Sequence, residues 1–419
     1  MPSVPPGGDP APAGGALPPA SLRGLGARPF GVYVHVPFCA TRCGYCDFNT
    51  YTAADLDLAS LAASDDPSSP ASWLEGLRRE LDLAARVLDG ADSPGLPRAD
   101  TVFVGGGTPT LLGPDGLTAV LDAVRTTFGL ADGAEVTTEA NPESTGPQLL
   151  GRIADAGYTR LSLGMQSDVD HVLAALDRRH TPGAAVAAAH SALDAGLAHV
   201  NLDLIYGTPT ESDDDLRRSL DAVLASGADH LSAYGLIVEE GTALHRRITR
   251  GELPMPDDDV LADRYEIVDD ALTGAGFGWY EVSNWARDPA ARCRHNLGYW
   301  SGGDWWGAGP GAHSHVGGTR WWNVPHPARY SAALAAGRSP AEARETLGPV
   351  ERHVERVLLD LRTVDGLAVG VLDPVGRDAG TRAARDGLLS AGDWQRGRAV
   401  LTRRGRLLAD GVAMALTGD

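Results

Sequence analysis

The sequence of 419 residues predicts an α/β fold followed by a small C-terminal winged-helix-like domain. From Phe30 onward, short runs rich in β-branched residues alternate with amphipathic helical stretches, and the alternation stops after about Pro325. Strands that alternate with helices form a parallel sheet. Right-handed crossovers either curl such a sheet into an open or closed barrel or lay it out doubly wound. We therefore expect a large α/β domain over residues 29–325 and a C-terminal domain over residues 326–419.

The first segment of the chain predicts no folded element. Residues 1–28 hold 7 Pro, 6 Gly and 5 Ala, with no charged region that leads into an apolar stretch. This composition offers little apolar surface to bury and does not match a secretory signal. We expect a disordered tail and, without an export signal, a cytoplasmic protein.

Six strands follow in order, with helices between them. Ser72 and Glu75 form a capping box at the start of the first full helix, in which leucines recur on one face. Gly157 and Gly196 stand where glycine commonly ends a helix. The expected strands are Gly31–Val36, Asp100–Val104, Glu135–Glu139, Arg160–Gly164, His199–Ile205 and His230–Leu236, and further helices are expected at Pro114–Phe128, Ser212–Ala225 and Asp257–Leu272.

Two segments fall outside this alternation. The polar stretch Thr50–Ala71 is expected to be a loop inserted before the first full helix. In the C-terminal domain, Pro349–Arg362 and Arg382–Leu389 are expected to be helices, and GRAVLTRRGRLLADGVAMAL is expected to form a hairpin or wing that leads into a last helix. The arginines of this segment fit a solvated wing, and the domain fits a lid over the barrel or a docking surface better than a DNA-binding module.

The charged residues argue against several classes of function. All 36 basic residues are arginine, so no lysine is present for a Walker-A loop or a Schiff base. The net charge of −19 argues against nucleic acid or an anionic membrane as a general partner. No stretch approaches the roughly 18 uninterrupted apolar residues of a membrane span.

Three of the four cysteines, Cys39, Cys43 and Cys46, lie within eight residues directly after the first strand. In a reducing compartment, cysteines are more often metal ligands or catalytic thiols than disulfides, and a disulfide here leaves one cysteine over. Structural zinc requires a fourth ligand, such as Cys293 or a histidine. Three thiolates can instead hold three irons of a [4Fe-4S] cluster and leave the fourth iron open. The spacing favours the iron–sulfur cluster.

Glycine-rich and polar segments follow the ends of the other strands. Gly106, Gly107 and Thr108 belong to GGGTPT, where the backbone can approach a ligand closely. Glu139 can accept hydrogen bonds from both hydroxyls of a ribose, as acidic residues do in dinucleotide sites. Each such residue alone fits a solvated strand end, but active sites of parallel β/α barrels lie where these strand ends meet. The same ends also carry Gln166, Asp203 and Ile237, and Arg178 is expected on the helix after the fourth strand.

The C-x3-C-x2-C spacing, with Tyr45 and Phe48 beside the last cysteine, resembles the radical SAM superfamily. In that superfamily the open iron binds the amino and carboxylate groups of S-adenosylmethionine (SAM). The resemblance implies a partial (β/α)6 barrel, and YVHVPFCATRCGYCDF, VFVGGGTPT, TTEANPES, RLSLGMQS, LDLIYGTP, YEVSNWA, CRHNLGYW and WWGAGPGAHS resemble, in order, its coproporphyrinogen III oxidase-like branch. Carried over residue by residue, the implied SAM contacts are Tyr33, Tyr45, Gly106, Gly107, Thr108, Glu139, Gln166, Arg178, Asp203 and Ile237.

Two members of this branch differ next to the cluster motif. The oxygen-independent coproporphyrinogen III oxidase carries a further cysteine two residues after the third, where this chain has Phe48. CDF together with HNLGYW resembles instead the HemW-type heme chaperones. This resemblance implies heme as a further cofactor and heme-accepting apoproteins, such as respiratory proteins, as partners. It is also compatible with a homodimer and with peripheral membrane contact through the acceptors. Because all the implied SAM contacts are present, a porphyrinogen oxidase or another SAM-dependent radical enzyme is the alternative to the heme chaperone.

The segment CRHNLGYW also offers ligands for heme. Cys293 and His295 carry the thiolate and imidazole that bind heme iron, and Tyr299 and Trp300 can stack on a flat macrocycle. If the segment is extended, the two ligand side chains point the same way and can face the barrel mouth together. The alternative is an ordinary buried polar turn. Weaker candidates are His313 and His315 in GPGAHSH.

Overall fold

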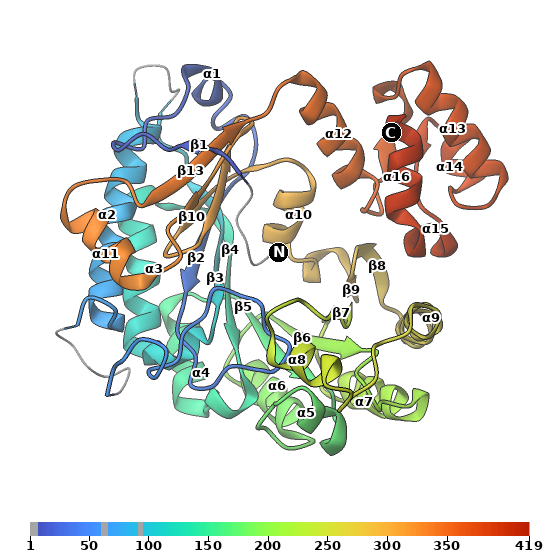
Figure 1. The fold of residues 1–419 in the computed structure, drawn as a ribbon, viewed down its shortest axis with the longest axis horizontal. Helices are drawn as coiled ribbons and strands as arrows, with labels where there is room; N and C mark the ends of the chain where they lie inside the picture. Colours follow the sequence, from blue (N-terminus) through green and yellow to red (C-terminus); the bar gives the residue numbers. More distant parts are fainter. Residues whose placement is uncertain (1–6, 60–65, 91–94, 419) are drawn as a thin grey trace.

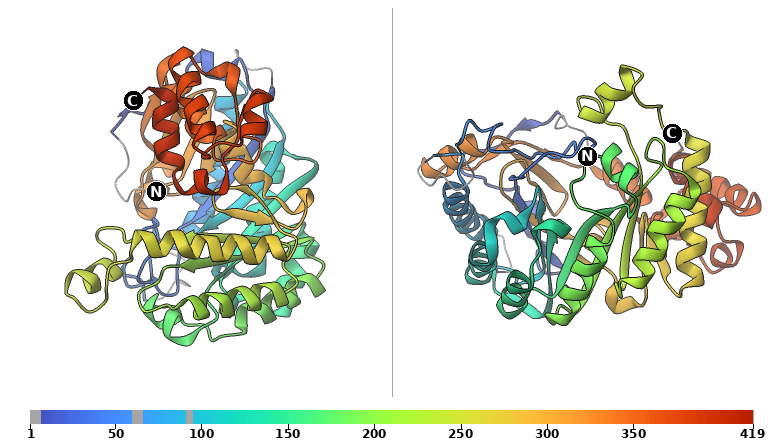
Figure 2. Two further views of the ribbon diagram at one scale, coloured as in Figure 1. Left: turned by 90° about the vertical axis from the view of Figure 1, so that its right-hand side faces the viewer. Right: turned by 90° about the horizontal axis from the view of Figure 1, so that it is seen from below.

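The computed structural model describes residues 7–59, 66–90 and 95–418, and its strands are dominated by one sheet. Within these residues the sheet has 13 strands in the order β1-β13-β12-β11-β10-β2-β3-β4-β5-β6-β7-β9-β8. The central strands are parallel and curve into a partial barrel (Figures 1 and 2). They are β2 (Phe30–Val36), β3 (Ala99–Gly106), β4 (Leu130–Ala140), β5 (Arg160–Gln166), β6 (His199–Tyr206) and β7 (His230–Gly235). The predicted α/β barrel fold and its six strands are confirmed.

Helices cover the outer face of the barrel (Figure 2). Every residue of β5 is buried, as expected for a parallel strand covered on both faces. The helices of this domain are α2 (Pro70–Leu88), α3 (Gly113–Phe128), α4 (Pro147–Ala156), α5 (Asp170–Ala175), α6 (Ala184–Asp194), α7 (Asp213–Ala225), α8 (Ala243–Thr249) and α9 (Asp258–Gly274). In the part of the chain that the structure describes, no helix is long and apolar enough to cross a bilayer.

Helix α2 begins earlier than the sequence predicts. Its N-cap is Ser69, whose hydroxyl accepts a hydrogen bond from the N–H of Ser72 (3.2 Å), and Pro70 occupies the first helical position. The Ser72 hydroxyl donates to the carbonyl oxygen of Asp66 (2.8 Å). The capping box predicted from Ser72 and Glu75 is therefore wrong. Of the predicted loop insertion before this helix, residues 60–65 lie outside the described residues.

The sheet continues beyond the predicted strands at both edges. The added elements are β10 (Asp304–Ala308), β11 (His313–Val316), β12 (Thr319–Asn323) and β13 (Ala341–Thr346) beside β2, with α11 (Pro327–Ala335) packed on α2, and β9 (Asn284–Ala286) and β8 (Gly278–Glu281) beside β7. Because β13 belongs to this sheet, the chain stays in the large domain past Pro325. We propose the domain boundary after Thr346. The half-exposed β13 lacks the apolar alternation that reveals a strand in the sequence.

Residues 7–28 depart from the predicted disordered tail and lie against the sheet (Figure 1). Strand β1 (Asp9–Pro10) pairs antiparallel with β13, and α1 (Pro19–Leu22) follows. Leu22 and Leu25 are 7% and 2% exposed and join the main core. Two leucines and a two-residue strand pairing anchor this segment, and neither stands out in a composition rich in Pro, Gly and Ala.

The C-terminal domain has its own small core, which extends from Val357 to Leu416. Its elements are α12 (Pro349–Asp360), β14 (Leu367–Ala368), α13 (Pro374–Arg385), α14 (Ala391–Gln395), β15 (Arg398–Ala399), α15 (Arg403–Leu407) and α16 (Ala409–Thr417), with β14 and β15 forming a two-stranded sheet. The helix predicted at Arg382–Leu389 is therefore displaced toward the N-terminus. Arg406 pairs with Asp269 of α9 (2.9 Å), so this arginine holds the two domains together and is not part of a solvated wing.

Candidate functional site

The segment that carries the three clustered cysteines follows β2 at the carboxyl-terminal end of the barrel strands. The N–H of Cys39 donates to the carbonyl oxygen of Tyr51 (2.9 Å), which ties the two ends of the segment together. The N–H of Gly44 donates to the Leu176 carbonyl oxygen after α5 (3.2 Å), and its own carbonyl oxygen accepts from the N–H of Leu244 in α8 (2.7 Å). The segment is thus fixed across the barrel mouth by backbone bonds to two helices.

The thiols lie beside hydrogen-bond donors and beside a glycine that leaves them room. The Thr108 hydroxyl donates to Cys39 Sγ (3.9 Å), and Arg178 Nη1 donates to Cys43 Sγ (3.4 Å). A Cβ on Gly107 would lie 3.0 Å from Cys39 Sγ and 2.4 Å from a backbone carbonyl oxygen, so a side chain there is excluded. Burial raises the pKa of Cys39 to about 11. The thiolate form therefore needs a positively charged partner such as a metal centre.

The fourth cysteine lies apart from these three. Cys293 precedes α10 (Arg294–Trp300) at the opposite, amino-terminal end of the barrel strands, where its thiol contacts Glu135 Oε1 (3.6 Å). Among the described residues, no three His, Cys, Asp or Glu side chains gather as ligands of a single metal ion. These positions argue against a zinc site completed by Cys293. Three thiols on one fixed loop fit a [4Fe-4S] cluster, whose irons occupy separate corners of a cube.

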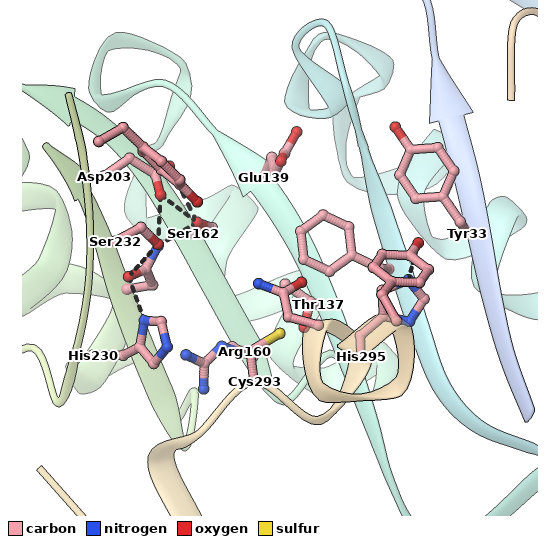
Figure 3. Close-up of a pocket in the computed structure, with 15 residues that line it drawn as sticks. Tyr33, Thr137, Glu139, Arg160, Ser162, Asp203, His230, Ser232, Cys293 and His295 are labelled. Atoms are coloured by element: carbon pink, nitrogen blue, oxygen red, sulfur yellow. Dashed lines mark hydrogen bonds between the residues drawn. The ribbon is translucent and has the colours of Figure 1, made fainter. Parts of the chain in front are cut away.

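Two buried carboxyl groups lie near the ends of β4 and β6. Glu139 Oε2 accepts the N–H of Gly106 (2.8 Å), and Asp203 accepts from Ser162 Oγ (3.2 Å) and Asn201 Nδ2 (2.8 Å) (Figure 3). Burial and the nearby charge of Asp203 raise the pKa of Glu139 to about 8, and burial also raises the pKa of Asp203. Among the described residues, neither carboxyl group forms an ion pair with a basic side chain, so the two groups can accept hydroxyl donors and cationic groups of a ligand.

An asparagine that the sequence analysis missed connects the thiol loop to the strand ends. Asn141 Nδ2 donates to Thr108 Oγ1 (3.1 Å), and Asn141 Oδ1 accepts from Arg178 Nη2 (2.8 Å), which also donates to the carbonyl oxygen of Gly164 (2.6 Å). Gln166 follows at a β-bulge with a positive φ of 63°. The signal available in the sequence was an Asn-Pro pair directly after a strand.

The remaining predicted SAM contacts also lie at this end of the barrel. The hydroxyl of Tyr33 pairs with His35 Nδ1 (2.9 Å), and Tyr45 packs with the buried side chains of Leu236 and Leu244. Ile237 follows β7 and is 71% exposed, so a bound ligand can cover it. The structure therefore gathers the three cysteines and the ten predicted SAM contacts around one barrel mouth.

Below this mouth, the barrel encloses a cavity of about 200 Å³ (Figure 3). Tyr33, Glu139 and Asp203 line it toward the mouth, while Arg160 and His230 line it near the start of their strands. Side chains of α10 close the floor. The cavity is smaller than the ~300–1,000 Å³ typical of pockets for drug-sized ligands, so a whole heme does not fit inside the barrel.

The structure contradicts the prediction that Cys293 and His295 face the barrel mouth. The segment is not extended: the carboxylate of Glu135 accepts the N–H groups of Arg294 (2.9 Å) and His295 (3.0 Å) and thereby starts α10 at the floor. His295 Nδ1 pairs with Thr101 Oγ1 (2.8 Å), and Nε2 pairs with the Tyr299 hydroxyl (2.8 Å). Burial lowers the pKa of His295 to about 3. Its ring is therefore neutral and has no free nitrogen for heme iron.

We therefore expect His295→Ala to affect stability and not heme loading. Loss of the ring leaves the buried hydroxyls of Thr101 and Tyr299 without their hydrogen-bond partner. Each buried group without a partner lowers the free energy of unfolding by about 1–3 kcal/mol. Urea unfolding should show the lower stability, while the folded variant should take up heme at wild-type stoichiometry. If the folded variant lacked a Soret band after incubation with heme, this expectation would be wrong and His295 would belong to the heme site.

The weaker histidine candidates lie in β11, in the extension of the sheet. His315 Nδ1 pairs with the carbonyl oxygen of Gly303 (2.8 Å), and its Nε2 accepts the N–H of Gly318 (3.0 Å), so both nitrogens are engaged. His313 stacks on Trp322 with ring centroids 5.9 Å apart. Neither residue belongs to the cavity lining.

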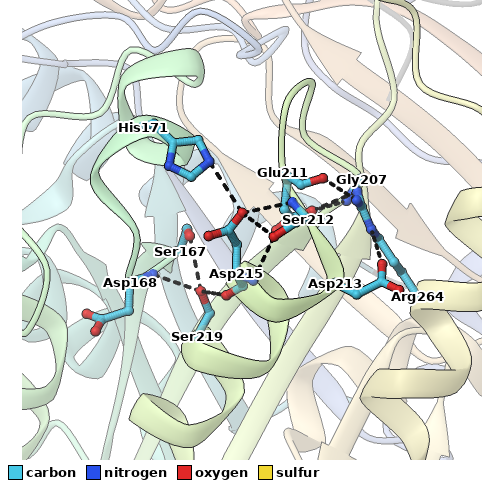
Figure 4. Close-up of polar contacts among 10 residues, drawn as sticks. All are labelled: Ser167, Asp168, His171, Gly207, Glu211, Ser212, Asp213, Asp215, Ser219 and Arg264. Carbon is cyan, nitrogen blue, oxygen red and sulfur yellow. Dashed lines mark hydrogen bonds and ion pairs between the residues drawn. The ribbon is translucent and has the colours of Figure 1, made fainter.

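A second buried glutamate supports the loop after β6 (Figure 4). Glu211 Oε2 accepts the N–H of Gly207 (2.7 Å) and pairs with Arg264 Nη1 of α9 (3.0 Å). Burial raises the pKa of Glu211 to about 7. Like Glu139, it accepts a glycine N–H from a loop that follows a strand, but it has a basic partner and does not line the cavity. Substitutions of Glu211 and Arg264 therefore provide matched controls for substitutions of buried charged residues in the candidate site.

Comparisons with known proteins agree with this geometry. The model of the radical SAM superfamily matches residues 33–223. The heme chaperone HemW of Mycobacterium tuberculosis (strain H37Rv) is 57% identical over 403 residues, which cover 96% of this chain and 98% of that protein. HemW of Bacillus subtilis is 30% identical over 400 residues, covering 92% and 99% of the two chains.

The solved structures include one whose fold is similar over nearly the whole chain. Coproporphyrinogen III oxidase from Escherichia coli, a radical SAM enzyme, matches with a TM-score of 0.76 and 22% identity over 93% of this chain and 90% of its own. This likeness concerns the fold alone. From the sequence identity and coverage of its relatives, the chain belongs to the radical SAM superfamily and, within it, to the family of the HemW heme chaperones.

Proposed function

We propose that this protein is a radical SAM heme chaperone, which binds a [4Fe-4S] cluster, SAM and heme and delivers heme to acceptor proteins. The observation that carries the proposal is the near full-length identity to proteins named heme chaperone HemW, combined with a barrel mouth that keeps all three thiols. In this proposal Cys39, Cys43 and Cys46 hold the cluster.

SAM occupies the barrel mouth beside the cluster in this proposal. The backbone around Gly106 and Gly107 approaches the ligand, Glu139 accepts from its ribose hydroxyls, and Arg178 pairs with its carboxylate. Ile237 packs against the apolar part of the ligand. When bound to a reduced cluster, SAM is a source of radical chemistry in this superfamily. The residues of this chain bind and orient it, and the Asn141 network keeps Arg178 between the thiol loop and β5.

The cluster motif also bears on the choice between chaperone and oxidase. Phe48 stands where the oxidase has a further cysteine, and its side chain is 55% exposed on the loop at the mouth. An exposed aromatic side chain supports contact with an apolar partner such as heme better than it supports added cluster chemistry. The size of the barrel cavity supports heme binding outside it. A porphyrinogen oxidase is the alternative that the complete SAM site supports.

The cellular setting is part of the same proposal. We place the protein in the cytoplasm, with respiratory apoproteins as heme acceptors and without nucleic acid as a partner. A homodimer and membrane contact through the acceptors are compatible with it. Size-exclusion chromatography with light scattering, with and without heme, tests the dimer.

Heme transfer and porphyrinogen conversion separate the two functions. The anaerobically reconstituted protein is titrated with heme and then mixed with an apo heme protein, such as apomyoglobin, and the Soret band of each protein is followed. We expect stoichiometric heme uptake followed by transfer. In parallel, the protein is incubated with SAM, a reductant and coproporphyrinogen III, and no decarboxylated product is expected by mass spectrometry. Multiple-turnover decarboxylation would overturn the proposal in favour of the oxidase.

A further inference from the structure

Arg160, the first residue of β5, is a buried cation without an acidic partner. Its side chain lines the barrel cavity and the residue is 1% exposed. Nη1 donates to the carbonyl oxygen of Ala291 (2.7 Å), whereas Nη2 is buried and has no hydrogen-bond partner among the described residues. No described carboxylate lies within ion-pair distance of its guanidinium. Figure 3 shows this guanidinium between His230 and Cys293.

The other polar groups around the cavity do not neutralise this charge. His230 uses both ring nitrogens, toward Asn201 Oδ1 (2.6 Å) and the Tyr280 hydroxyl (2.7 Å). Asp203 accepts its hydrogen bonds from Ser162 and Asn201, and Glu139 accepts the N–H of Gly106 at the mouth.

The acidic groups beneath the cavity are likewise bonded to other partners. Glu135 accepts the first N–H groups of α10. Glu281 Oε1 accepts from Asn284, and its Oε2 is buried without a hydrogen-bond partner among the described residues, but Glu281 does not line the cavity. The hydroxyl of Thr137 also lines the cavity, is fully buried and has no partner among the described residues. Among the described residues, the cavity lining therefore contains two buried donors without a hydrogen-bond partner, Arg160 Nη2 and the Thr137 hydroxyl.

We propose that this cavity binds a small molecule through a carboxylate group, which pairs with Arg160 and accepts a hydrogen bond from Thr137. A buried, unpaired guanidinium is costly, and its planar fork of N–H donors matches a carboxylate. The cavity holds the equivalent of about seven waters at ~30 Å³ each, which fits a short carboxylic acid or a carboxylate arm of a larger molecule. This ligand lies below the SAM contacts and is separate from a whole heme.

The test measures how carboxylates affect thermal unfolding of the protein reconstituted with cluster and SAM. Acetate, propionate and succinate are titrated at constant ionic strength against chloride. We expect a saturable increase in Tm with at least one carboxylate and none with chloride. In Arg160→Met this response should disappear, while Tm without carboxylate should equal or exceed that of wild type, because an uncompensated buried charge is removed. Thr137→Val should keep the fold and weaken the response several-fold.

Arg264→Met is the matched control for a buried arginine. Arg264 pairs with Glu211 outside the cavity, so this variant should lose stability but keep the carboxylate response. If wild type shows no saturable response, or if Arg160→Met and Thr137→Val both respond like wild type, the proposal is wrong. If Arg160→Met does not fold, the response of Thr137→Val alone decides between these outcomes.

A heme-loaded sample distinguishes the two sources of the carboxylate. If heme removes the response to free carboxylates, a propionate arm of heme occupies the cavity. If the response persists in the heme-loaded protein, the ligand is an independent small acid. Isotope-labelled propionate, followed by NMR line broadening in wild type and Arg160→Met, provides a second measurement that does not depend on stability.

Discussion

Replacing Cys39, Cys43 or Cys46 by serine is expected to remove the iron–sulfur cluster. In the proposed site each thiolate would hold one iron corner, and a serine hydroxyl is a poor ligand for iron at neutral pH. The broad visible absorbance of thiolate-ligated iron should be lost, and iron and acid-labile sulfide should fall from about four per chain toward zero. SAM binding should fall with the cluster, because in the proposed site the open iron is one of the anchors of SAM.

Cys293→Ser is the matched control for these three variants. Its thiol contacts Glu135 at the floor of the barrel, and burial raises its pKa, so it is a neutral side chain remote from the loop. The variant should keep full iron and sulfide content. Loss of metal in Cys293→Ser, or one equivalent of zinc without iron in anaerobically purified wild type, would contradict the assignment of the cluster to the three-cysteine loop.

The elements of the fold that depend on local sequence patterns could be predicted from the sequence. Each central strand is a short apolar run followed by a helix, and the strand ends meet at one side of a parallel sheet. The sequence therefore predicts that Glu139, Asp203 and the glycines at the end of β3 lie close together. By contrast, β13 is half-exposed, and residues 7–28 are held by pairings with distant segments. Such long-range contacts leave no periodic pattern of apolar residues in the sequence.

The error at Cys293 and His295 has a similar origin. The prediction assumed an extended segment, in which two side chains two residues apart point the same way, but Glu135, more than 150 residues earlier in the chain, binds the N–H groups that start α10. One buried carboxylate thus decides whether the two side chains face the mouth or the floor. The same limit applies to Arg160, which in the sequence is an ordinary first residue of a strand, whereas in the described part of the structure its guanidinium has no acidic partner.

The second large effect is expected at Glu139, where Glu139→Gln should weaken SAM binding while iron content stays intact. The amide preserves the side-chain volume and an oxygen for the N–H of Gly106, but it removes the charge that, in the proposed site, accepts the ribose hydroxyls. Hydrogen bonds to charged groups contribute about 1.5–3 kcal/mol, which corresponds to roughly 10- to 150-fold in Kd. Anaerobic calorimetry on the reconstituted protein measures this change. Glu211→Gln should lower stability but leave SAM affinity unchanged.

The pH dependence of SAM binding gives this prediction a second readout. Because the pKa of Glu139 is raised to about 8, its carboxyl group is largely protonated below that pH in the free protein. A ligand that requires the carboxylate releases this proton on binding, so SAM affinity should increase as the pH rises from 6.5 toward 8.5 and then level off. Glu139→Gln has no proton to release and should lose this dependence, whereas Glu211→Gln should keep it. Equal pH profiles for wild type and Glu139→Gln would show that Glu139 does not contact the ribose as a carboxylate, and SAM would then have to be placed elsewhere across the strand ends.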